Sequence, residues 1–276
     1  MTMAIRDAAT VMLMRDSPEG MQVFMLRRNL NSDFVGGAYV FPGGAVDLAD
    51  RDDPELNEIC VGRDGGRANE LLGLEEGALA FWVAAIRECF EEAGVLLAQD
   101  DTGGFVSFAD ADVAARFDEH RRAVDSGDRR LADVCRAEGL VLPLGDIHYF
   151  AHWITPRGPT RRYDTRFYVC MAPEEQVPLH DNRETVASLW VNPNEALAMH
   201  ARGELDLILP TIKNLEAIGR FDRAADLLAA AARVGAVPSV EPVIVRDSGG
   251  VRILLPGDPG YEEAFNDEPE DGTVIV

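Results

Sequence analysis

The chain has 276 residues, and 47% of them are hydrophobic, which is enough apolar material for one elaborated domain. Its 48 acidic residues outnumber its 26 basic residues and give a formal net charge of −22. Because a nucleic-acid surface needs clustered lysine and arginine, this balance argues against polymeric DNA or RNA as a partner. A small phosphate ester that enters with a divalent cation stays compatible, since the cation cancels the local repulsion.

The cysteines and the N-terminal stretch indicate the cellular compartment of the protein. The four cysteines are scattered and form no C-x-x-C pair, so they indicate neither a zinc site nor a disulfide framework. The apolar stretch at the N-terminus is interrupted by Arg6, Asp7 and Arg15 and is too short for a signal peptide or a membrane span. We expect a soluble, cytoplasmic protein with reduced thiols.

The first elements in chain order are strands. Two apolar, β-branched runs, residues 8–14 and 21–28, flank the turn-prone "SPEG" and predict a hairpin. "GGAYVFPGG", residues 36–44, predicts a short strand that ends on a proline and two glycines. Such glycines let a backbone approach a ligand closely, although an ordinary loop fits equally well. Residues 45–77 are acidic and weakly periodic, and we expect them to form a surface insertion.

Helices and strands then alternate. A helix is predicted over 78–93 and a strand over "VLLA", residues 95–98; two helices separated by "DSGD" are predicted between 109 and 138. The remaining elements are listed in order: a second hairpin from 147–155 and 165–172, a strand at 186–192, helices over 193–203 and 209–235, and two strands around the Gly-Gly turn at 249–250. The last ten residues are acidic and expected to be mobile.

This order predicts an α/β fold, an α/β/α sandwich around a mixed sheet. We expect a single domain over 1–276, with insertions at about 45–77 and 104–142 and a C-terminal extension at about 205–276. The helices between 109 and 138, or the C-terminal hairpin, are candidates for a homodimer interface because they lie outside the predicted core.

The stretch "RECFEEAG", residues 87–94, concentrates negative charge on one helix face. With Glu88 at zero on the helical wheel, Glu91 falls at about −60° and Glu92 at about +40°. The opposite side of the helix is apolar, which suits a core. One reading is a solvated face with an Arg87–Glu91 pair; the other is a divalent cation site, since hard cations need several carboxylate oxygens.

"FPGG", residues 41–44, followed by "AAIRECFEEAGV", residues 84–95, resembles the Nudix box, G-x5-E-x7-R-E-U-x-E-E-x-G-U with U apolar. The second half of the box is filled from Arg87 to Val95. Counting back from Arg87 places Gly73 at the opening glycine and Leu79 where the first glutamate belongs. The "FPGG" context instead favours Gly44 as the opening glycine, with residues 45–77 as an insertion within the box.

Further motifs resemble one branch of the Nudix hydrolases, which carries such an insertion and includes a peroxisomal acyl-CoA diphosphatase. They are "WITP" at 153–156, "RRYDTRFY" at 161–168 and "LPGDPGY" at 255–261. The resemblance implies a pyrophosphohydrolase that cleaves a nucleoside diphosphate derivative, with CoA or acyl-CoA as the first choice and ADP-ribose or NADH as the alternative. A non-catalytic ligand sensor is a rival of another class, but such modules commonly lose the acids of the box.

The resemblance also implies the metal ligands and a base. Glu88, Glu91 and Glu92 would bind Mg²⁺ or Mn²⁺, with the backbone carbonyl of Gly44 as a further ligand. Glu88 or Glu184 would act as general base. For Glu184, a salt bridge with a neighbour such as Arg183 is an equal alternative.

Arginines are the candidates for binding phosphate, because their planar guanidinium groups match phosphate oxygens. Arg162 and Arg166 would share one strand face, and Arg28 is a weaker candidate. Asp164 lies on the same face, so an internal Arg–Asp pair is a serious rival. We expect Arg87 to orient the acids. Other polar and aromatic residues near the second hairpin are expected to serve packing; they are His148, His152, Trp153, Phe167 and Tyr168.

Overall fold

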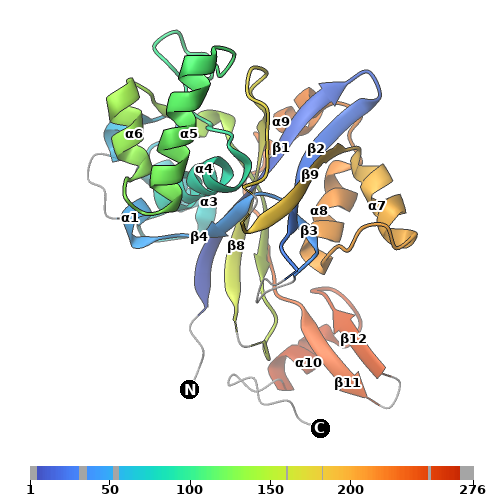
Figure 1. Ribbon diagram of the computed structural model, residues 1–276. Coiled ribbons are helices and arrows are strands. Elements are labelled where there is room, and N and C mark those ends of the chain that lie inside the picture. Colours follow the sequence, from blue (N-terminus) through green and yellow to red (C-terminus); the bar gives the residue numbers. More distant parts are fainter. Residues whose placement is uncertain are drawn as a thin grey trace.

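A computed structural model describes residues 5–30, 36–51, 56–159, 161–181, 183–247 and 250–267 (Figure 1). An eight-stranded mixed sheet forms its centre. Its strands are β1 (Arg6–Ser17), β2 (Gly20–Arg28), β3 (Tyr39–Val40), β4 (Gly43–Ala45), β7 (His148–Ile154), β8 (Tyr163–Met171), β9 (Thr185–Val191) and β10 (Ser239–Val240). The helices are α1 (Leu48–Arg51), α2 (Leu56–Ile59), α3 (Gly65–Leu72), α4 (Leu79–Ala93), α5 (Ala111–Asp125), α6 (Leu131–Glu138), α7 (Pro193–Ala201), α8 (Leu209–Ile218), α9 (Ala224–Ala231) and α10 (Tyr261–Asp267), with a 3₁₀ turn at Leu144–Asp146.

The central strand of the sheet is β1, which pairs antiparallel with β2 and with β4 and parallel with β8. Strands β7 and β8 are antiparallel, and β9 pairs with β2. Both predicted hairpins are therefore confirmed. Two smaller sheets lie apart from this one: β5 (Cys60–Val61) with β6 (Leu142–Pro143), and β11 (Val243–Asp247) with β12 (Gly250–Leu254).

Two hydrophobic clusters cover the two faces of the sheet. Because side chains alternate along a strand, β1 sends Val11 and Leu13 into one cluster and Met12 and Met14 into the other. The first cluster contains the apolar side of α4, and the second contains residues of α7, α8 and α9. Helices lie on both sides of the sheet in Figure 1. The predicted α/β/α sandwich around a mixed sheet is confirmed.

The strand predicted for residues 95–98 is wrong. This segment is extended and fully buried, but the amide side chain of Gln176 takes the place of a neighbouring strand. The Leu96 N–H donates to Gln176 Oε1 at 2.8 Å, and Gln176 Nε2 donates to the carbonyl oxygens of Leu96 at 3.0 Å and Val106 at 2.8 Å. The backbone is satisfied without a strand ladder.

The segment predicted as a surface insertion, 45–77, contains α1, α2, β5 and α3 where it is described. It is not confined to the surface, because Leu56, Ile59, Ala68 and Leu72 are buried in the same core cluster as α4. The segment therefore packs against the helix that carries the glutamates.

The elements outside the sandwich follow the sequence pattern closely. Helices α5 and α6 separate at the predicted "DSGD" break, and the strands β11 and β12 form the predicted C-terminal hairpin (Figure 1). The Tyr261 hydroxyl donates to the carbonyl of Glu241 at 2.8 Å and ties α10 to the segment before this hairpin. The tail predicted to be mobile lies outside the described residues, apart from Asp267. Among the described residues, no helix combines the length and apolar character that crossing a bilayer requires.

Candidate active site

Helix α4 has one buried apolar side and one charged side. Trp82, Ile86 and Phe90 are at most 1% exposed, as the wheel predicts. The helix ends at Gly94, whose φ of 66° is left-handed and whose N–H bonds back to the carbonyls of Cys89 and Phe90. The acidic side of the helix contacts the two glycines that begin β4.

The first two residues of β4, Gly43 and Gly44, touch two of the glutamates. The Gly43 N–H donates to Glu92 Oε2 at 2.9 Å. A Cβ placed on Gly44 would lie 2.5–2.7 Å from the carboxylate atoms of Glu88, closer than any real contact. The close approach expected from the glycines is therefore made to a carboxylate of the protein itself.

Arg87 lies among the acids with every N–H engaged. Its Nε donates to Asp50 Oδ1 at 3.0 Å, and Nη2 donates to Asp50 Oδ2 at 3.0 Å and to the Ala45 carbonyl at 2.8 Å. Its Nη1 donates to Glu88 Oε1 at 2.9 Å and to Glu91 Oε2 at 3.0 Å. A guanidinium has five N–H groups, and these contacts use all five. Arg87 therefore holds the carboxylates in place and has no donor left for a ligand.

Asp50 is a site residue that the sequence reading missed. Counting back from Arg87 predicts that Leu79 fills the place of the first glutamate of the box and that this element is lost. The structure instead pairs Arg87 with Asp50, which is 3% exposed and follows Gly44 after five residues. Leu79 packs against the core cluster. The signal was available: counting G-x5 forward from Gly44 reaches a carboxylate.

The three glutamates have raised pKa values. Burial is the largest cause and raises the pKa of Glu88 to about 7 and of Glu91 to about 8, against the lowering effect of Arg87. Burial and the nearby Glu88 raise the pKa of Glu92 well above its usual value, although the Gly43 N–H and Arg28 act the other way. A cluster with this excess of buried negative charge favours a cation beside it.

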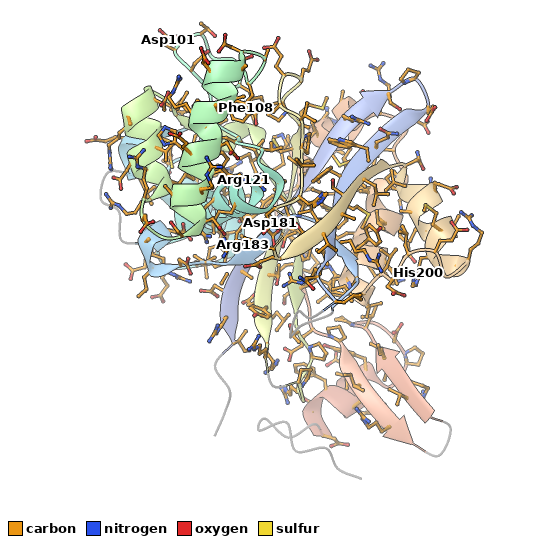
Figure 2. All side chains as sticks on the ribbon, in the orientation of Figure 1. Asp101, Phe108, Arg121, Asp181, Arg183 and His200 are labelled. Atoms are coloured by element: carbon orange, nitrogen blue, oxygen red, sulfur yellow. The ribbon has the colours of Figure 1, made fainter. Side chains whose placement is uncertain are left out.

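Arg121 on α5 closes the end of the glutamate helix. Its Nε donates to the Glu91 carbonyl at 2.9 Å, and Nη2 donates to the carbonyls of Glu92 at 3.0 Å and Leu179 at 3.2 Å. A cation at this position satisfies carbonyls that a helix end leaves free and opposes the helix dipole. Through Leu179, Arg121 (labelled in Figure 2) also joins α4 to the segment that follows β8. A backbone bond from the Leu179 N–H to the Ala93 carbonyl, 2.9 Å long, makes a second link.

The loop 172–184 brings Glu184 to the acidic face. Glu184 acts electrostatically on both Glu88 and Glu92 and raises their pKa values, although burial is the largest cause for each. Asp181 fixes this turn by accepting hydrogen bonds from the backbone of Arg183, Glu184 and Thr185.

The alternative salt bridge between Glu184 and Arg183 is wrong, because Arg183 pairs with Asp125 of α5. Arg28, the weaker phosphate candidate, lies near enough to Glu92 to lower its pKa, although burial raises that pKa more.

The two arginines of the second hairpin lie elsewhere. Arg162 donates to Glu241 Oε1 at 2.6 Å, and Arg166, 4% exposed, pairs with Asp164. Within the described ranges neither forms a hydrogen bond or ion pair with the three glutamates. The rival internal Arg–Asp pair is therefore what the structure contains. His152 also pairs with Asp164, and the three aromatic residues named above are buried, as expected for core positions; they are Trp153, Phe167 and Tyr168.

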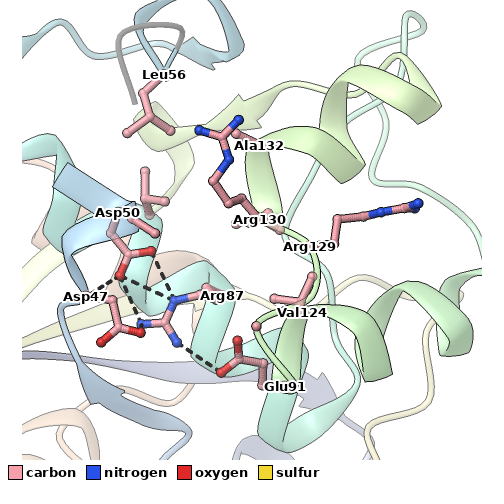
Figure 3. A pocket seen from close by; sticks show the side chains of 13 residues that line it. Asp47, Asp50, Leu56, Arg87, Glu91, Val124, Arg129, Arg130 and Ala132 are labelled. Atoms are coloured by element: carbon pink, nitrogen blue, oxygen red, sulfur yellow. Dashed lines mark hydrogen bonds and ion pairs between the residues drawn. The ribbon is translucent and has the colours of Figure 1, made fainter. Parts of the chain in front are cut away.

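A cavity of about 100 Å³ opens beside the acids (Figure 3). Asp50, Arg87 and Glu91 form one wall, and the end of α5 and the start of α6 face them across the cavity. The lining residues are Asp47, Ala49, Asp50, Leu56, Val83, Arg87, Glu91, Val124, Gly127, Arg129, Arg130, Leu131 and Ala132.

The donor set suits a hard divalent cation in kind. Three carboxylates with raised pKa values share one side of α4, and a glycine backbone faces them without a side chain between. No three His, Cys, Asp or Glu side chains of the described residues are arranged to enclose an ion on their own. This arrangement fits an ion such as Mg²⁺, which substrate phosphates commonly help to bind.

Comparison with known proteins places these features in a family. The NUDT19 Nudix domain family matches residues 66–218, more than half of the chain. The chain is 31% identical to the acyl-coenzyme A diphosphatase NUDT19 of Gallus gallus, over 94% of this chain and 80% of that protein. It is 27% identical to the Homo sapiens protein of the same name, over 89% of this chain and 73% of that one.

A crystal structure of a Nudix hydrolase from Alicyclobacillus acidocaldarius has the same fold. The TM-score is 0.70 at 28% identity, and the match covers 83% of this chain and 97% of that one. Nudix hydrolases generally use divalent metal ions, which agrees with the carboxylate face of α4. The chain therefore belongs to the NUDT19 Nudix domain family and is a Nudix hydrolase.

Proposed function

We propose that this protein is a metal-dependent pyrophosphohydrolase that cleaves the diphosphate of CoA or acyl-CoA. The observation that carries the proposal is the set of three carboxylates on one side of α4, of which Glu92 is buried and Glu88 and Glu91 are half-buried. Arg87 holds Glu88 and Glu91, and the Gly43 N–H of β4 holds Glu92. The substrate is taken from the relatives that are named acyl-coenzyme A diphosphatases and that match most of this chain.

The metal would be Mg²⁺ or Mn²⁺, bound by Glu88, Glu91 and Glu92, with the Gly44 carbonyl as a candidate further ligand. Support comes from the raised pKa values, because burial makes these carboxylates costly to ionise unless a cation lies beside them. When bound, such an ion supplies Lewis-acid stabilisation of the charge that develops on the phosphoryl oxygens.

The protein's own residues would supply orientation and a base. Water attacks one phosphorus atom, the bridging P–O bond breaks, and CoA yields 4′-phosphopantetheine and adenosine 3′,5′-bisphosphate. We assign the proton of the water to a carboxylate oxygen of Glu184, which is exposed and forms no ion pair among the described residues. Glu88 is the alternative base, but its carboxylate already accepts from Arg87 and abuts Gly44. Arg28 is the candidate to contact a phosphate.

Two further proposals concern the cellular compartment and the oligomeric state. The four cysteines all lie among the described residues and none of them forms a disulfide, which suits a reducing cytoplasm. We also keep a homodimer through α5–α6 or the C-terminal hairpin as a proposal, which sedimentation or light scattering at several protein concentrations would test. A single species of monomer mass throughout would exclude the dimer.

The first experiment offers CoA, an acyl-CoA, ADP-ribose and NADH in parallel, with Mg²⁺ and then Mn²⁺. The variants Glu91→Gln and Glu92→Gln should lower hydrolysis at least about a hundredfold, because they remove ligand charge. Both should keep the fold, since a neutral amide replaces a carboxyl that burial already disfavours as a charge. The control is Glu119→Gln, a glutamate exposed on α5.

The outcomes separate the hypotheses. Hydrolysis of CoA that disappears in the two variants supports the proposal. Preference for ADP-ribose or NADH would keep the chemistry and replace the substrate. If a nucleotide binds but is not hydrolysed with either Mg²⁺ or Mn²⁺, the assignment as an enzyme is wrong and a ligand sensor is favoured.

A further inference from the structure

The cavity beside the acids is built by parts of the chain outside the central sheet. Leu56 comes from α2, Val124 from the last turn of α5, and Leu131 and Ala132 from the first turn of α6. These four side chains are at most 5% exposed. They face Asp50, Arg87 and Glu91 across the opening (Figure 3).

Arg87, Asp50 and Glu91 on the acidic wall are engaged with one another, whereas the carboxylate of Asp47 is 65% exposed. Arg87 uses all five N–H groups on Asp50, Glu88, Glu91 and the Ala45 carbonyl. Asp50 additionally accepts from the Asp47 N–H at 2.8 Å. The wall therefore has little to offer an anionic group.

The arginines at the rim are engaged as well. Arg130 pairs with Asp133, and Arg129 donates to His120 Nδ1 at 2.7 Å. What the cavity presents to a ligand is mainly the aliphatic surface of Val83, Val124 and Leu131.

The size of the cavity limits what it can hold. An apolar cavity of about 150 Å³ in another protein accommodates benzene, with six carbon atoms. By the same measure, about 100 Å³ suits roughly four or five carbon atoms. A compact, branched aliphatic group fits this space, whereas a nucleobase does not.

The position of the cavity limits where that group sits on the substrate. Glu91 both lines the cavity and belongs to the acidic face where the diphosphate is proposed to bind. A group in the cavity must therefore lie within a few bonds of the diphosphate. In CoA the pantetheine-side phosphate continues through one methylene into a carbon with two methyl groups. In ADP-ribose and NADH a polar ribose stands at this place.

We propose that this cavity is the subsite for the dimethyl-substituted carbon of the pantetheine arm and that it selects CoA over nucleotide sugars. The inference rests on the proposed function and adds to it the side chains that recognise one half of the substrate. The aliphatic side of the cavity favours the two methyl groups, and it penalises a ribose because the hydroxyls that face Val83, Val124 and Leu131 would be buried without partners.

The test fills the cavity and measures binding of the two product halves by calorimetry. Ala132→Leu adds bulk to the cavity wall. The dissociation constant of 4′-phosphopantetheine should rise about tenfold or more, in line with the discrimination that a methylene in an apolar pocket provides. The dissociation constant of adenosine 3′,5′-bisphosphate should stay within about twofold of the wild-type value. Ala115→Leu, the same change at an exposed position of α5, should alter neither.

A second variant guards against misfolding. If Ala132→Leu melts well below the wild type, Val124→Leu at the opposite end of the same wall replaces it, with the same expected split between the two ligands. Equal weakening of both ligands, no weakening of either, or a wild-type protein that does not bind 4′-phosphopantetheine at millimolar concentration would overturn the subsite.

The proposed function and the subsite can fail separately. Hydrolysis of CoA at the same rate by the wild type and by Ala132→Leu would overturn the subsite and leave the function standing. Cavity-dependent binding of 4′-phosphopantetheine by a protein that hydrolyses no CoA would overturn the function and leave the subsite standing.

Discussion

Two charged clusters in this protein both look like parts of a substrate site in the sequence, but they differ in charge balance. On α4, Glu88 and Glu91 share the guanidinium of Arg87 with Asp50, and Glu92 accepts from the Gly43 N–H. On the second hairpin, Arg162 pairs with Glu241 and Arg166 pairs with Asp164. The first cluster keeps an excess of negative charge, whereas both arginines of the second already have a carboxylate partner.

The comparison shows why charge type alone does not identify a site. Asp164 and Glu241 absorb the two arginines, so an incoming phosphate would have to displace an existing partner. Arg87 cannot do the same for the glutamates, because Asp50 takes two of its five N–H groups and the Ala45 carbonyl takes another. The residual charge of a cluster, counted after its internal pairs, is the better guide to ligand binding.

The largest effect is expected from removing the partner that keeps Arg87 in place. Asp50→Ala leaves a buried guanidinium without its main counter-charge and should lower the free energy of unfolding by about 3–5 kcal/mol. Urea unfolding measures it. Asp47→Ala is the matched control: its carboxylate is 3.7 Å from Arg87 and 65% exposed, so the cost should be at most about 1 kcal/mol. Equal costs for the two variants would contradict the role given to Asp50.

Arg121→Met should weaken metal binding at the acidic face of α4 without changing any of its three glutamates. The variant keeps an unbranched apolar stem and loses the donors to the carbonyls of Glu91, Glu92 and Leu179. We expect Mn²⁺ binding, measured by calorimetry, and hydrolysis to fall by about 10–100-fold, as for other residues that orient metal ligands.

Arg122→Met is the control for Arg121, because Arg122 is exposed and, among the described residues, its one ion pair is with Asp118 on the same helix. A lower melting temperature of Arg121→Met with unchanged Mn²⁺ affinity would reduce Arg121 to a purely structural residue.

A smaller effect is expected from pH in the metal-free protein. Burial raises the pKa of Glu88 to about 7 and of Glu91 to about 8, whereas unfolded glutamates titrate near 4.3. Between pH 5 and 8 the unfolded chain therefore binds fewer protons than the folded one, and stability falls as pH rises. With chelator present, the melting temperature should be lower at pH 8 than at pH 5.5.

Adding Mg²⁺ should reverse much of that loss at pH 8 and do little at pH 5.5. Glu88→Gln should flatten the pH dependence, because it removes one of the shifted groups, whereas Glu119→Gln should leave it intact. A metal-free protein that becomes more stable toward pH 8 would show that the glutamate face is not the controlling cluster.

The smallest effect on hydrolysis is expected at Arg162. Its guanidinium bonds to Glu241 and to the Thr155 carbonyl, so Arg162→Gln should leave kcat and KM unchanged while lowering the free energy of unfolding by about 1–3 kcal/mol. Steady-state kinetics and urea unfolding measure the two quantities. A marked rise in KM would restore Arg162 as a substrate contact and weaken the comparison drawn above.

Much of the fold follows from periodicity in the sequence. The 3.6-residue period places the three glutamates opposite the buried Trp82 and Phe90, and the β-branched runs around "SPEG" identify the first hairpin. These features depend on neighbours within a few turns or residues, so local pattern is sufficient to find them.

The features that the sequence reading missed depend on distant partners. Residues 95–98 look like a strand, but their hydrogen bonds come from Gln176, 80 residues from Leu96. Asp50 is hidden because a long segment separates it from Arg87, although its spacing from Gly44 is regular. Arg121 carries no local signal, since its acceptors are backbone carbonyls of α4 and of a loop.

The amide of Gln176 has a consequence for motion. It bonds to Leu96 and Val106 at once and is itself 4% exposed. The loop that begins beside it and carries Glu184 cannot lift away at this end without exposing the buried Leu96. The amide hydrogen of Leu96, which donates to Gln176 Oε1, should then exchange with solvent only in rare openings that release both segments together. The segment that leads to Glu184 is therefore fixed at its start before any substrate arrives.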